Sequence, residues 1–399
     1  MTSTSCKLAA EDVLAECLAG HPPAALAPAL LEDACAPALF SILVEGLADR
    51  FEPALCDAYA SLFADAIART VGDVDAAALV ERFDRVRRPR TVAIEPRCVF
   101  VLSRVTLGAD IAVTSVLLDA AKRRFPNARI VFVGPPKNFE LFAADARLEH
   151  ASVAYRRGTL RARLAVWKEL RALCGGADSL VLDPDSRLTQ LGLLPICADE
   201  RYHLFESRAY GGDGGQSLPE LAAAWARETL QIDGARPYLS LAAPVAAQAG
   251  IALSLGVGEN PAKRLPDPFE EKLMMLLAAT GLPLTIDKGA GGEEAARVVE
   301  ACRRAGIEPA FWEGSFAGFA AIIAASRLYV GYDSAGQHVA AAAGVPLISI
   351  FAGFPTPRMF ARWRPVAKNA HVIRVDQPDV EGTLASVREA LRWTGCRVL

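Results

Sequence analysis

The stretch from Phe311 to Pro357 constrains the fold most, because its apolar and polar segments alternate at the spacing of helix, strand, helix and strand. Residues 328–332 and 347–351 are short apolar segments of strand length, and a small-residue helix between them ends at a glycine. A polar turn joins the first strand to that helix, with the sequence Asp333-Ser334-Ala335-Gly336-Gln337-His338. The pattern predicts a parallel, Rossmann-type α/β structure.

The turn at residues 333–338 is also a candidate anion site. The first backbone N–H groups of a helix lack partners, and the helix dipole favours negative charge there. In an open parallel sheet, such turns lie at the carboxyl ends of the strands, where ligands bind. The alternative is a generic turn in which Asp333 and Ser334 only cap the helix.

Composition sets the broad class of the chain. It has 399 residues, 52% hydrophobic and 22% charged, with a net charge of −3, which is typical of a globular protein rather than a disordered or nucleic-acid-binding one. The first residues show no basic stretch leading into an apolar core, so we expect no signal peptide. The nine cysteines are dispersed without a C-x-x-C pair, which predicts reduced thiols and a cytoplasmic location. These cysteines are Cys6, Cys17, Cys35, Cys56, Cys98, Cys174, Cys197, Cys302 and Cys396.

Three regions are expected along the chain. Residues 1–90 show only helical periodicity and end in the basic, proline-containing connector VRRPR. We expect them to form a helical cap or an oligomerisation surface with apolar faces of its own. Residues 91–235 and 236–399 each show alternating strands and helices, and a glycine-dense segment at 210–215 precedes the crossover between them.

The first α/β unit begins with a strand at 98–102, a turn, a helix at 111–124 and a strand at 130–133. Asp110 stands at the strand-to-helix turn, where a carboxylate could accept the proton of a substrate hydroxyl. An Asp at a helix N-cap is the structural alternative, and the two interpretations are compatible.

Further polar candidates follow other strands. Asp183 and Asp185 come directly after the strand at 178–182, where they either line a binding site or cap a turn, and the pair is a weak metal signal. In the second α/β unit, a glycine-rich loop at 256–266 carries Lys263, which would supply a positive charge where the backbone can approach a phosphate.

These motifs, in this order, resemble glycosyltransferase family 9, the ADP-heptose:lipopolysaccharide heptosyltransferases. The resemblance covers about residues 95–395. The family's D-[S/T]-G-x-x-H followed by A-A-x-G-x-P matches residues 333–338 and 342–346, with Ala335 in place of a glycine. Its S-x-x-G-D turn matches residues 103–110 with one residue added, Ala109, and its G-x-x-x-x-x-K-x-W-P loop matches 256–266 with Leu265 in place of tryptophan.

The resemblance implies a GT-B architecture, that is, two Rossmann-like domains facing across a cleft, here preceded by the helical region. It implies inverting glycosyl transfer without a metal or another cofactor, with Asp110 as the catalytic carboxylate. The implied donor-binding residues are Gly258, Lys263, Glu293, Asp333, Ser334, Ala335, Gly336 and His338. The acceptor-side candidates are Arg104, Asp183, Asp185 and Arg187.

The implied partners are a nucleotide-diphosphate sugar such as ADP-heptose and an acceptor that is a glycan, a lipid-linked molecule or a protein. Nucleic acid is not among them. We also expect a place at the inner face of the membrane, peripheral membrane contact, and homo-oligomerisation through the N-terminal helices. Two alternatives stay open: a nucleotide-sugar epimerase on the same fold, and a weakly active sugar-nucleotide-binding protein, because Ala109, Ala335 and Leu265 depart from the family pattern.

Overall fold

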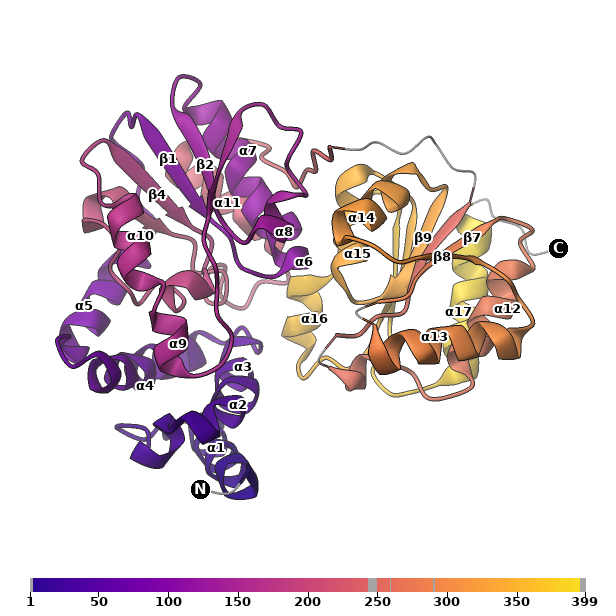
Figure 1. Cartoon of the computed structure of the whole chain (residues 1–399), viewed down its shortest axis with the longest axis horizontal. Helices are drawn as coiled ribbons and strands as arrows, with labels where there is room; N and C mark the ends of the chain where they lie inside the picture. The colour runs from indigo at the N-terminus through magenta and orange to yellow at the C-terminus, as the bar shows by residue number, and fades with distance from the viewer. Residues whose placement is uncertain (1–2, 243–249, 259, 290, 395–399) are drawn as a thin grey trace. The chain divides into compact units, whose positions relative to one another are not determined.

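The computed structural model describes residues 3–242, 250–258, 260–289 and 291–394. The chain divides into two compact units, each built around one parallel sheet (Figure 1). Unit 1 consists of residues Met1–Thr106, Val113–Phe139 and Ala146–Arg236, and unit 2 of residues Leu107–Ala112, Glu140–Asp145 and Pro237–Leu399.

The sheet of unit 1 has five strands in the order β3-β2-β1-β4-β5, and all of its neighbours pair in parallel. Its strands are β1 (Cys98–Leu102), β2 (Arg129–Gly134), β3 (Leu148–Ser152), β4 (Ser179–Asp183) and β5 (Tyr202–Leu204). Between β1 and α7 (Ser115–Arg124) the chain forms α6 (Leu107–Ala109) and η4 (Asp110–Thr114), of which residues Leu107–Ala112 belong to unit 2. The other connecting helices and turns of this sheet are α8 (Pro136–Phe139), α9 (Leu160–Leu164), α10 (Trp167–Cys174), η5 (Arg187–Thr189), η6 (Asp199–Arg201) and α11 (Leu218–Leu230). The central strands are buried on both faces, as a parallel sheet covered by helices requires.

The expected helical region before the first strand is present. It consists of α1 (Ser3–Leu18), η1 (Pro28–Leu31), η2 (Asp33–Cys35), α2 (Ala36–Ala38), η3 (Leu39–Val44), α3 (Glu45–Ala48), α4 (Pro53–Val71) and α5 (Ala76–Val86). Between α1 and α4 the chain forms short pieces rather than one long helix. Pro28 and Pro37 each occupy the first turn of a new piece, since proline is tolerated there but not within a helix.

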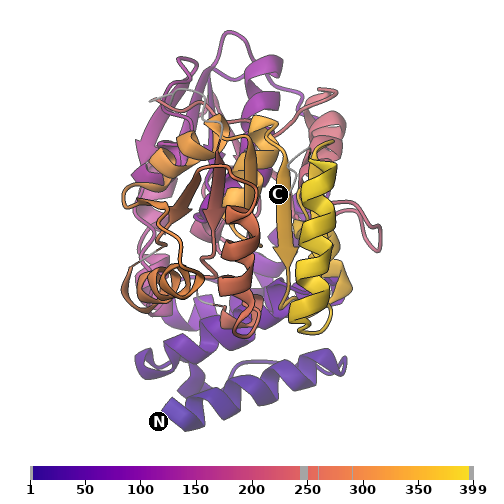
Figure 2. The same ribbon diagram turned by 90° about the vertical axis from the view of Figure 1, so that its right-hand side faces the viewer.

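The N-terminal helices do not have a core of their own. Phe63 of α4 and Leu43 of η3 are fully buried in one hydrophobic cluster that also contains Leu102 of β1, Val133 of β2 and Val181 of β4. Figures 1 and 2 show these helices, in indigo, packed below the sheet of unit 1. The expectation of a cap with separate apolar faces is therefore wrong, because the helices complete the core of unit 1.

Ion pairs fasten the same helices to the loops around β5. Arg82 of α5 donates to Asp199 at 2.8 Å and to the carbonyl of Gly192 at 3.1 Å. Arg87, which follows α5, forms a two-point contact with Glu206, with nitrogen–oxygen distances of 2.8 and 2.7 Å. Two-point contacts between arginine and carboxylate fix orientation as well as distance, so these contacts hold the loops around β5 in a fixed position relative to α5.

The sheet of unit 2 has six strands in the order β11-β10-β9-β6-β7-β8, again with parallel neighbours throughout. Its strands are β6 (Ile251–Ser254), β7 (Leu284–Asp287), β8 (Ala310–Trp312), β9 (Leu328–Tyr332), β10 (Leu347–Phe351) and β11 (Ala370–Arg374). Its helices are η7 (Pro261–Lys263), α12 (Phe269–Ala278), α13 (Gly292–Ala305), α14 (Phe316–Ala325), α15 (Ala335–Ala343), α16 (Pro357–Trp363) and α17 (Val380–Trp393). Apolar residues of β6, β9, β10, α12 and α17 form its core.

One expectation about the cysteines is corrected. Cys6 of α1 and Cys35 of η2 form a disulfide, so the prediction of reduced thiols is wrong for this pair. Six other cysteines are free, among them the buried Cys56 and Cys174, and Cys396 lies outside the described residues. Within the part of the chain that the structure describes, no helix is long and apolar enough to cross a membrane.

Candidate functional site

In unit 2, the loops after β6 and β9 meet at the carboxyl edge of the sheet. Lys263, at the end of η7, places its ammonium nitrogen 2.7 Å from a carboxylate oxygen of Asp333 and 3.2 Å from the Asp333 carbonyl oxygen. Asp333 is buried and directly follows β9, whereas the Lys263 side chain is about one-fifth exposed. The two residues that the motifs singled out separately are thus in direct contact.

The N-terminus of α15 lies in the same turn. Ser334 is its N-cap residue, but its side chain makes no capping hydrogen bond and lies 3.3 Å from the Tyr329 hydroxyl. The interpretation of this turn as a simple serine cap is therefore wrong. A Cβ atom on Gly336 would come within 2.3 Å of the same hydroxyl, so the glycine lets the first turn of α15 pack against Tyr329.

A chain of buried hydrogen bonds orients Asp333. Gln337 donates to the second Asp333 oxygen, and the Ser349 hydroxyl of β10 donates to Gln337 at 2.5 Å. Because Gln337 of α15 satisfies this oxygen, the other is left to face Lys263. The predicted turn over residues 333–338 is shorter than expected, because α15 begins at Ala335 and only Asp333 and Ser334 precede the helix. The role of these residues stays a prediction.

His338 of α15 is buried beside this pair. Burial lowers its pKa from 6.5 to about 4, and this outweighs the opposing effect of the Asp333 carboxylate; the Lys263 ammonium lowers the pKa further. The ring is therefore neutral at pH 7. It lies 5.8 Å, centroid to centroid, from the Trp363 ring and can orient the turn as a hydrogen-bonding group but not as a cation.

The depressed pKa of His338 predicts a pH dependence of stability. Between about pH 6.5 and pH 4 the unfolded chain binds a proton that folded His338 does not, so stability falls as the pH is lowered through this window. Denaturant unfolding at pH 7 and pH 5 should show a smaller loss for His338→Gln than for the unmodified protein. An equal loss in both proteins would mean that His338 titrates normally in the folded chain.

Sequence reasoning missed two residues that shape this loop. Gly353, with φ of +67°, lies so close to Ala262 and Lys263 that a Cβ would come within 2.4 Å of their backbone. The carboxylate of Glu294 accepts a hydrogen bond from the Val257 backbone at 3.1 Å. A Cβ atom on Gly256 or Gly289 would come within 3.0 Å of that carboxylate. A glycine after an apolar strand was the available signal for Gly353, whereas Glu294 had none beyond lying beside a predicted residue.

Two other predicted donor-binding residues, Gly258 and Glu293, lie in or near the loop after β6. Gly258 has φ of +59°, a left-handed conformation that favours glycine, and lies in the loop between β6 and η7. Glu293, in the first turn of α13, is exposed to solvent, whereas its neighbour Glu294 points into the loop. The carboxylate that reaches the glycine-rich loop is therefore the one at 294.

Asp110 does not occupy a helix N-cap. The helix after β1 begins at Leu107, and Asp110 is the first residue of η4, a π-helical turn between α6 and α7. A π turn accommodates one extra residue without ending a helix, so it can take up the residue that the sequence adds at Ala109 relative to the family motif. Such turns are frequent at functional sites. Asp110 is fully buried.

Both carboxylate oxygens of Asp183 accept hydrogen bonds that stabilise the turn after β4. One of its oxygens accepts from the Ser186 backbone at 2.6 Å, and the other accepts from the hydroxyls of Thr189 and Tyr202. Burial raises its pKa to about 6, although these hydrogen bonds oppose the shift. With both oxygens engaged, Asp183 fits the turn-capping alternative better than a role in contact with an acceptor.

Asp185 and Arg104 belong to a buried charge network at the same edge of unit 1. Asp185, with φ of +68°, pairs with Arg208 and accepts from the Ser207 hydroxyl at 2.8 Å. Arg104 donates to Ser207 at 2.6 Å and lies 3.9 Å from the Asp185 carboxylate. Arg187 starts η5 and is only partly buried. The structure thus brings Arg104 and Asp185 together and adds Arg208 as a buried partner of Asp185.

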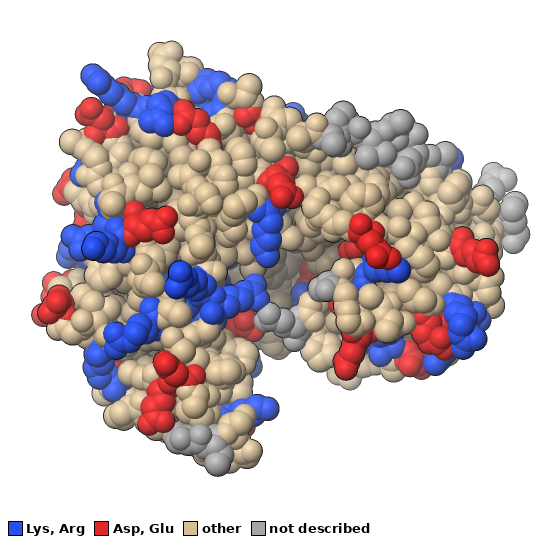
Figure 3. All heavy atoms as spheres, in the orientation of Figure 1, with Lys and Arg blue, Asp and Glu red and all other residues tan. Residues whose placement is uncertain are grey.

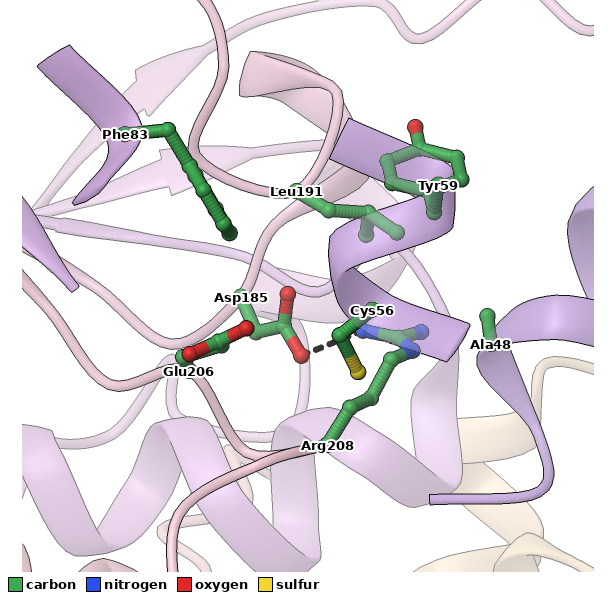
Figure 4. Close-up of a pocket in the computed structure, with 8 residues that line it drawn as sticks. All are labelled: Ala48, Cys56, Tyr59, Phe83, Asp185, Leu191, Glu206 and Arg208. Carbon is green, nitrogen blue, oxygen red and sulfur yellow. Dashed lines mark hydrogen bonds and ion pairs between the residues drawn. The ribbon is translucent and has the colours of Figure 1, made fainter. Parts of the chain in front are cut away.

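A small pocket of unit 1 borders this network (Figure 4). The N-terminal helices contribute Ala48, Cys56, Tyr59 and Phe83 to its lining, and the loops after β4 and β5 contribute Asp185, Leu191, Glu206 and Arg208. Burial raises the pKa of Glu206 to about 7, against the opposing effect of Arg87. The N-terminal helices therefore contribute directly to the pocket at the carboxyl ends of β4 and β5, where no role was visible from the sequence.

Comparison with known proteins identifies the second half of the chain. The model of glycosyltransferase family 9 (heptosyltransferase) matches residues 200–384, which include Lys263, Asp333 and His338. Residues 200–384 form a glycosyltransferase family 9 domain. The recognition made from the sequence motifs is confirmed by this match, as is the expected class of enzyme, a glycosyltransferase.

Solved structures of two heptosyltransferases and of one glycosyl transferase family 9 protein show a similar fold. E. coli heptosyltransferase WaaC with ADP-2-deoxy-2-fluoro heptose is 17% identical, with a TM-score of 0.54 over 74% of this chain and 99% of that one. E. coli ADP-heptose lps heptosyltransferase II is 18% identical, with a TM-score of 0.53 over 74% of this chain and 99% of that one. The glycosyl transferase family 9 from Veillonella parvula DSM 2008 is 14% identical, with a TM-score of 0.55 over 76% of this chain and 91% of that one. No curated protein matches the chain in sequence.

These likenesses confirm the predicted fold class. The two parallel sheets and their helices correspond to the GT-B heptosyltransferase structures, and the family 9 domain here is accompanied by the N-terminal helices of unit 1.

Proposed function

We propose that this family 9 protein transfers a heptose-like sugar from a nucleotide-diphosphate donor with inversion at the anomeric carbon and without a metal ion. The observation that carries the proposal is the contact of Lys263 with Asp333 beside the uncapped N-terminus of α15. A lysine and a row of free backbone N–H groups form the arrangement that stabilises a diphosphate leaving group.

The donor is proposed to be ADP-heptose or a close analogue. One similar structure holds ADP-2-deoxy-2-fluoro heptose. In unit 2 the diphosphate would lie against Lys263 and α15, and Glu294 is better placed than Glu293 to reach a ribose at the loop after β6.

The proposed chemistry is a single displacement. Asp110 takes the proton of the acceptor hydroxyl, and the oxygen attacks the anomeric carbon on the face opposite the diphosphate. The bond between that carbon and the diphosphate oxygen breaks, and its electron pair stays with the nucleoside diphosphate. Lys263 and the helix dipole of α15 stabilise the negative charge that develops there, in place of a metal ion.

The acceptor is proposed to be a glycan, either free, lipid-linked or on a protein, and a lipopolysaccharide core sugar is the first candidate. Another similar structure is an ADP-heptose lps heptosyltransferase. The N-terminal helices border the acceptor-side pocket of unit 1, so they are placed to adapt this edge to a particular acceptor.

The donor assignment is tested by a panel of nucleotide sugars. The purified protein is expected to melt at a higher temperature with ADP-heptose than with UDP- or GDP-sugars, because a ligand that binds only the folded state stabilises it by mass action. An altered sugar released from donor alone would favour the epimerase alternative. Binding without any turnover on a panel of glycan acceptors would favour a sugar-nucleotide-binding protein.

Replacing Lys263 tests the diphosphate site. Lys263→Ala should weaken ADP binding about tenfold to a hundredfold, because a hydrogen bond to a charged group contributes roughly 1.5–3 kcal/mol. Calorimetry measures the affinity, and Lys272→Ala, which removes an exposed lysine of the same unit, is the matched control.

The unpaired Asp333 left by this change would itself repel a diphosphate. The double variant Lys263→Ala/Asp333→Asn removes that repulsion. If it restored the unmodified affinity, the lysine would only neutralise Asp333 and would not contact the donor.

A further inference from the structure

A buried carboxylate lies behind the glycine-rich loop of unit 2. Acidic side chains of this unit are visible at its surface in Figure 3, in red, as is usual for carboxylates. Glu270, on α12, is different, because it is only 2% exposed. A buried carboxylate is costly unless cations or hydrogen-bond donors compensate it. The fold supplies such partners, and they belong to the segments that shape the loop.

Three side chains donate to the same oxygen of Glu270. Arg264, which directly follows η7, donates from Nε at 3.2 Å, Arg297 of α13 donates from a terminal nitrogen, and the Tyr332 hydroxyl donates at 3.3 Å. Both arginines are only partly exposed. Two cations and one hydroxyl thus converge on one buried anion, so that each partner holds the others in place.

Two of these donors also bind the backbone at the ends of the loop. Before the loop, Arg297 donates a second hydrogen bond to the Leu255 carbonyl at 2.9 Å. At the other end, the Leu265 backbone N–H donates to the Tyr332 hydroxyl at 3.3 Å. Leu265 is buried in the core of unit 2 and stands where the family pattern has a tryptophan. The loop is therefore tied at both ends to Glu270.

Lys263 lies between these anchors. Arg264, which contacts Glu270, is the next residue in the chain. On the opposite side, two neighbouring residues at the end of β9 contact the two partners, since Tyr332 donates to Glu270 and Asp333 lies 2.7 Å from the Lys263 ammonium. The position of the ammonium thus depends on contacts that Glu270 holds together.

We infer that Glu270 is a positioning residue that holds Lys263 where it binds the donor diphosphate. The inference rests on the proposed function, and it adds a buried residue that acts through its neighbours rather than on the donor. Glu270 acts through Arg264, because the backbone of Arg264 continues that of Lys263. A binding group has to be held within about 0.5 Å of its productive position, so a loosened loop weakens the contact with the diphosphate.

The test compares the ADP affinity of the unmodified chain, Lys263→Ala, Glu270→Gln and the double variant by calorimetry. Glu270→Gln keeps the size of the side chain but removes its charge, and it should weaken ADP binding about fivefold to tenfold, as removal of one member of a coupled network does. In the Lys263→Ala background, the same change should weaken binding by less than about twofold, because no ammonium is left to position. A residue that only stabilised the fold would not distinguish the two backgrounds.

A second variant tests the same link if Glu270→Gln does not fold. Tyr332→Phe removes the hydroxyl that joins Leu265 to Glu270 without leaving a charge unpaired, and it should weaken ADP binding about threefold to fivefold. The matched control is Glu271→Gln, which makes the same change of charge at the next residue of α12, on a side chain that is partly exposed. It should keep the affinity within about twofold of the unmodified protein.

Hydrogen exchange separates this inference from the proposed function. The amides of residues 262–265 should exchange several-fold faster in Glu270→Gln and in Tyr332→Phe than in the unmodified protein, whereas those of β10 should not change. Normal ADP affinity of Lys263→Ala would overturn the proposed diphosphate site, and faster exchange would still support Glu270 as the anchor of the loop. Unchanged exchange in both variants would overturn the inference, as would an equal loss of ADP affinity from Glu270→Gln with and without Lys263.

Discussion

Replacement of Asp110 by Asn is expected to lower turnover by about 10²–10⁴-fold while ADP affinity and melting temperature stay close to those of the unmodified protein. Asn keeps the size of the side chain and much of its hydrogen bonding, but it cannot take the acceptor proton. Asp110 is fully buried in the π-helical turn η4, so the change acts at a fixed position in the fold. Steady-state kinetics and donor calorimetry on one variant measure both quantities.

Asp119→Asn is the matched control, since Asp119 lies on α7 of the same helical segment and forms a surface pair with Arg123. It should keep turnover within about twofold, because surface ion pairs contribute little. Near-normal turnover of Asp110→Asn would remove Asp110 from the role of base. Asp183 and Asp185 would be poor replacements, as their oxygens already accept hydrogen bonds from neighbouring side chains.

The second large effect is expected from removing the N-terminal helices. A chain that begins at Glu95 lacks Phe63 and the other buried residues of α1–α5, and it exposes the face of β1, β2 and β4 that they cover. We expect unit 1 of this chain not to fold. Hydrogen exchange should show rapid exchange of peptides from β1 and β4, and the soluble yield should fall.

A point variant tests the same idea without truncation. Phe63→Ala should cost about 3–5 kcal/mol of unfolding free energy, as is typical for loss of a buried phenylalanine. Leu8→Ala removes an exposed side chain of α1 and should cost about 0.5 kcal/mol or less. Slow exchange of β1 and β4 in the truncated chain would show that the sheet folds without the helices.

The strands that the sequence predicted are the interior strands of the two sheets. β1, β2 and β4 in unit 1, and β9 and β10 in unit 2, appear as apolar runs because they are buried on both faces. The unpredicted strands are the sheet edges, β3 and β5 in one unit and β8 and β11 in the other. Edge strands are short or polar, as in Leu148–Ser152, and give no continuous apolar run.

The candidate site was predictable where one motif contains the interacting residues. Residues 333–338 follow one another, so a polar strand-to-helix junction could be inferred from local chemistry, although the helix begins at Ala335, inside the expected turn. The Gly353 contact with Lys263 and the Glu294 contact with Val257 join residues far apart in the chain, and no local pattern encodes such distances. The core shared by the N-terminal helices and the sheet was missed for the same reason, because helical periodicity marks an apolar face but not its partner.

That shared core affects how the protein is made. Residues 3–86 leave the ribosome before the strands on which their apolar faces pack. Arg87 can pair with Glu206 only after a further 119 residues have been synthesised. Chains are extended at about 5–20 residues per second, so these helices remain uncovered for several seconds during synthesis. During this interval the apolar faces of the helices are available for chaperone binding. Synonymous codons that slow translation between residues 90 and 206 would lengthen the time for which these faces stay exposed.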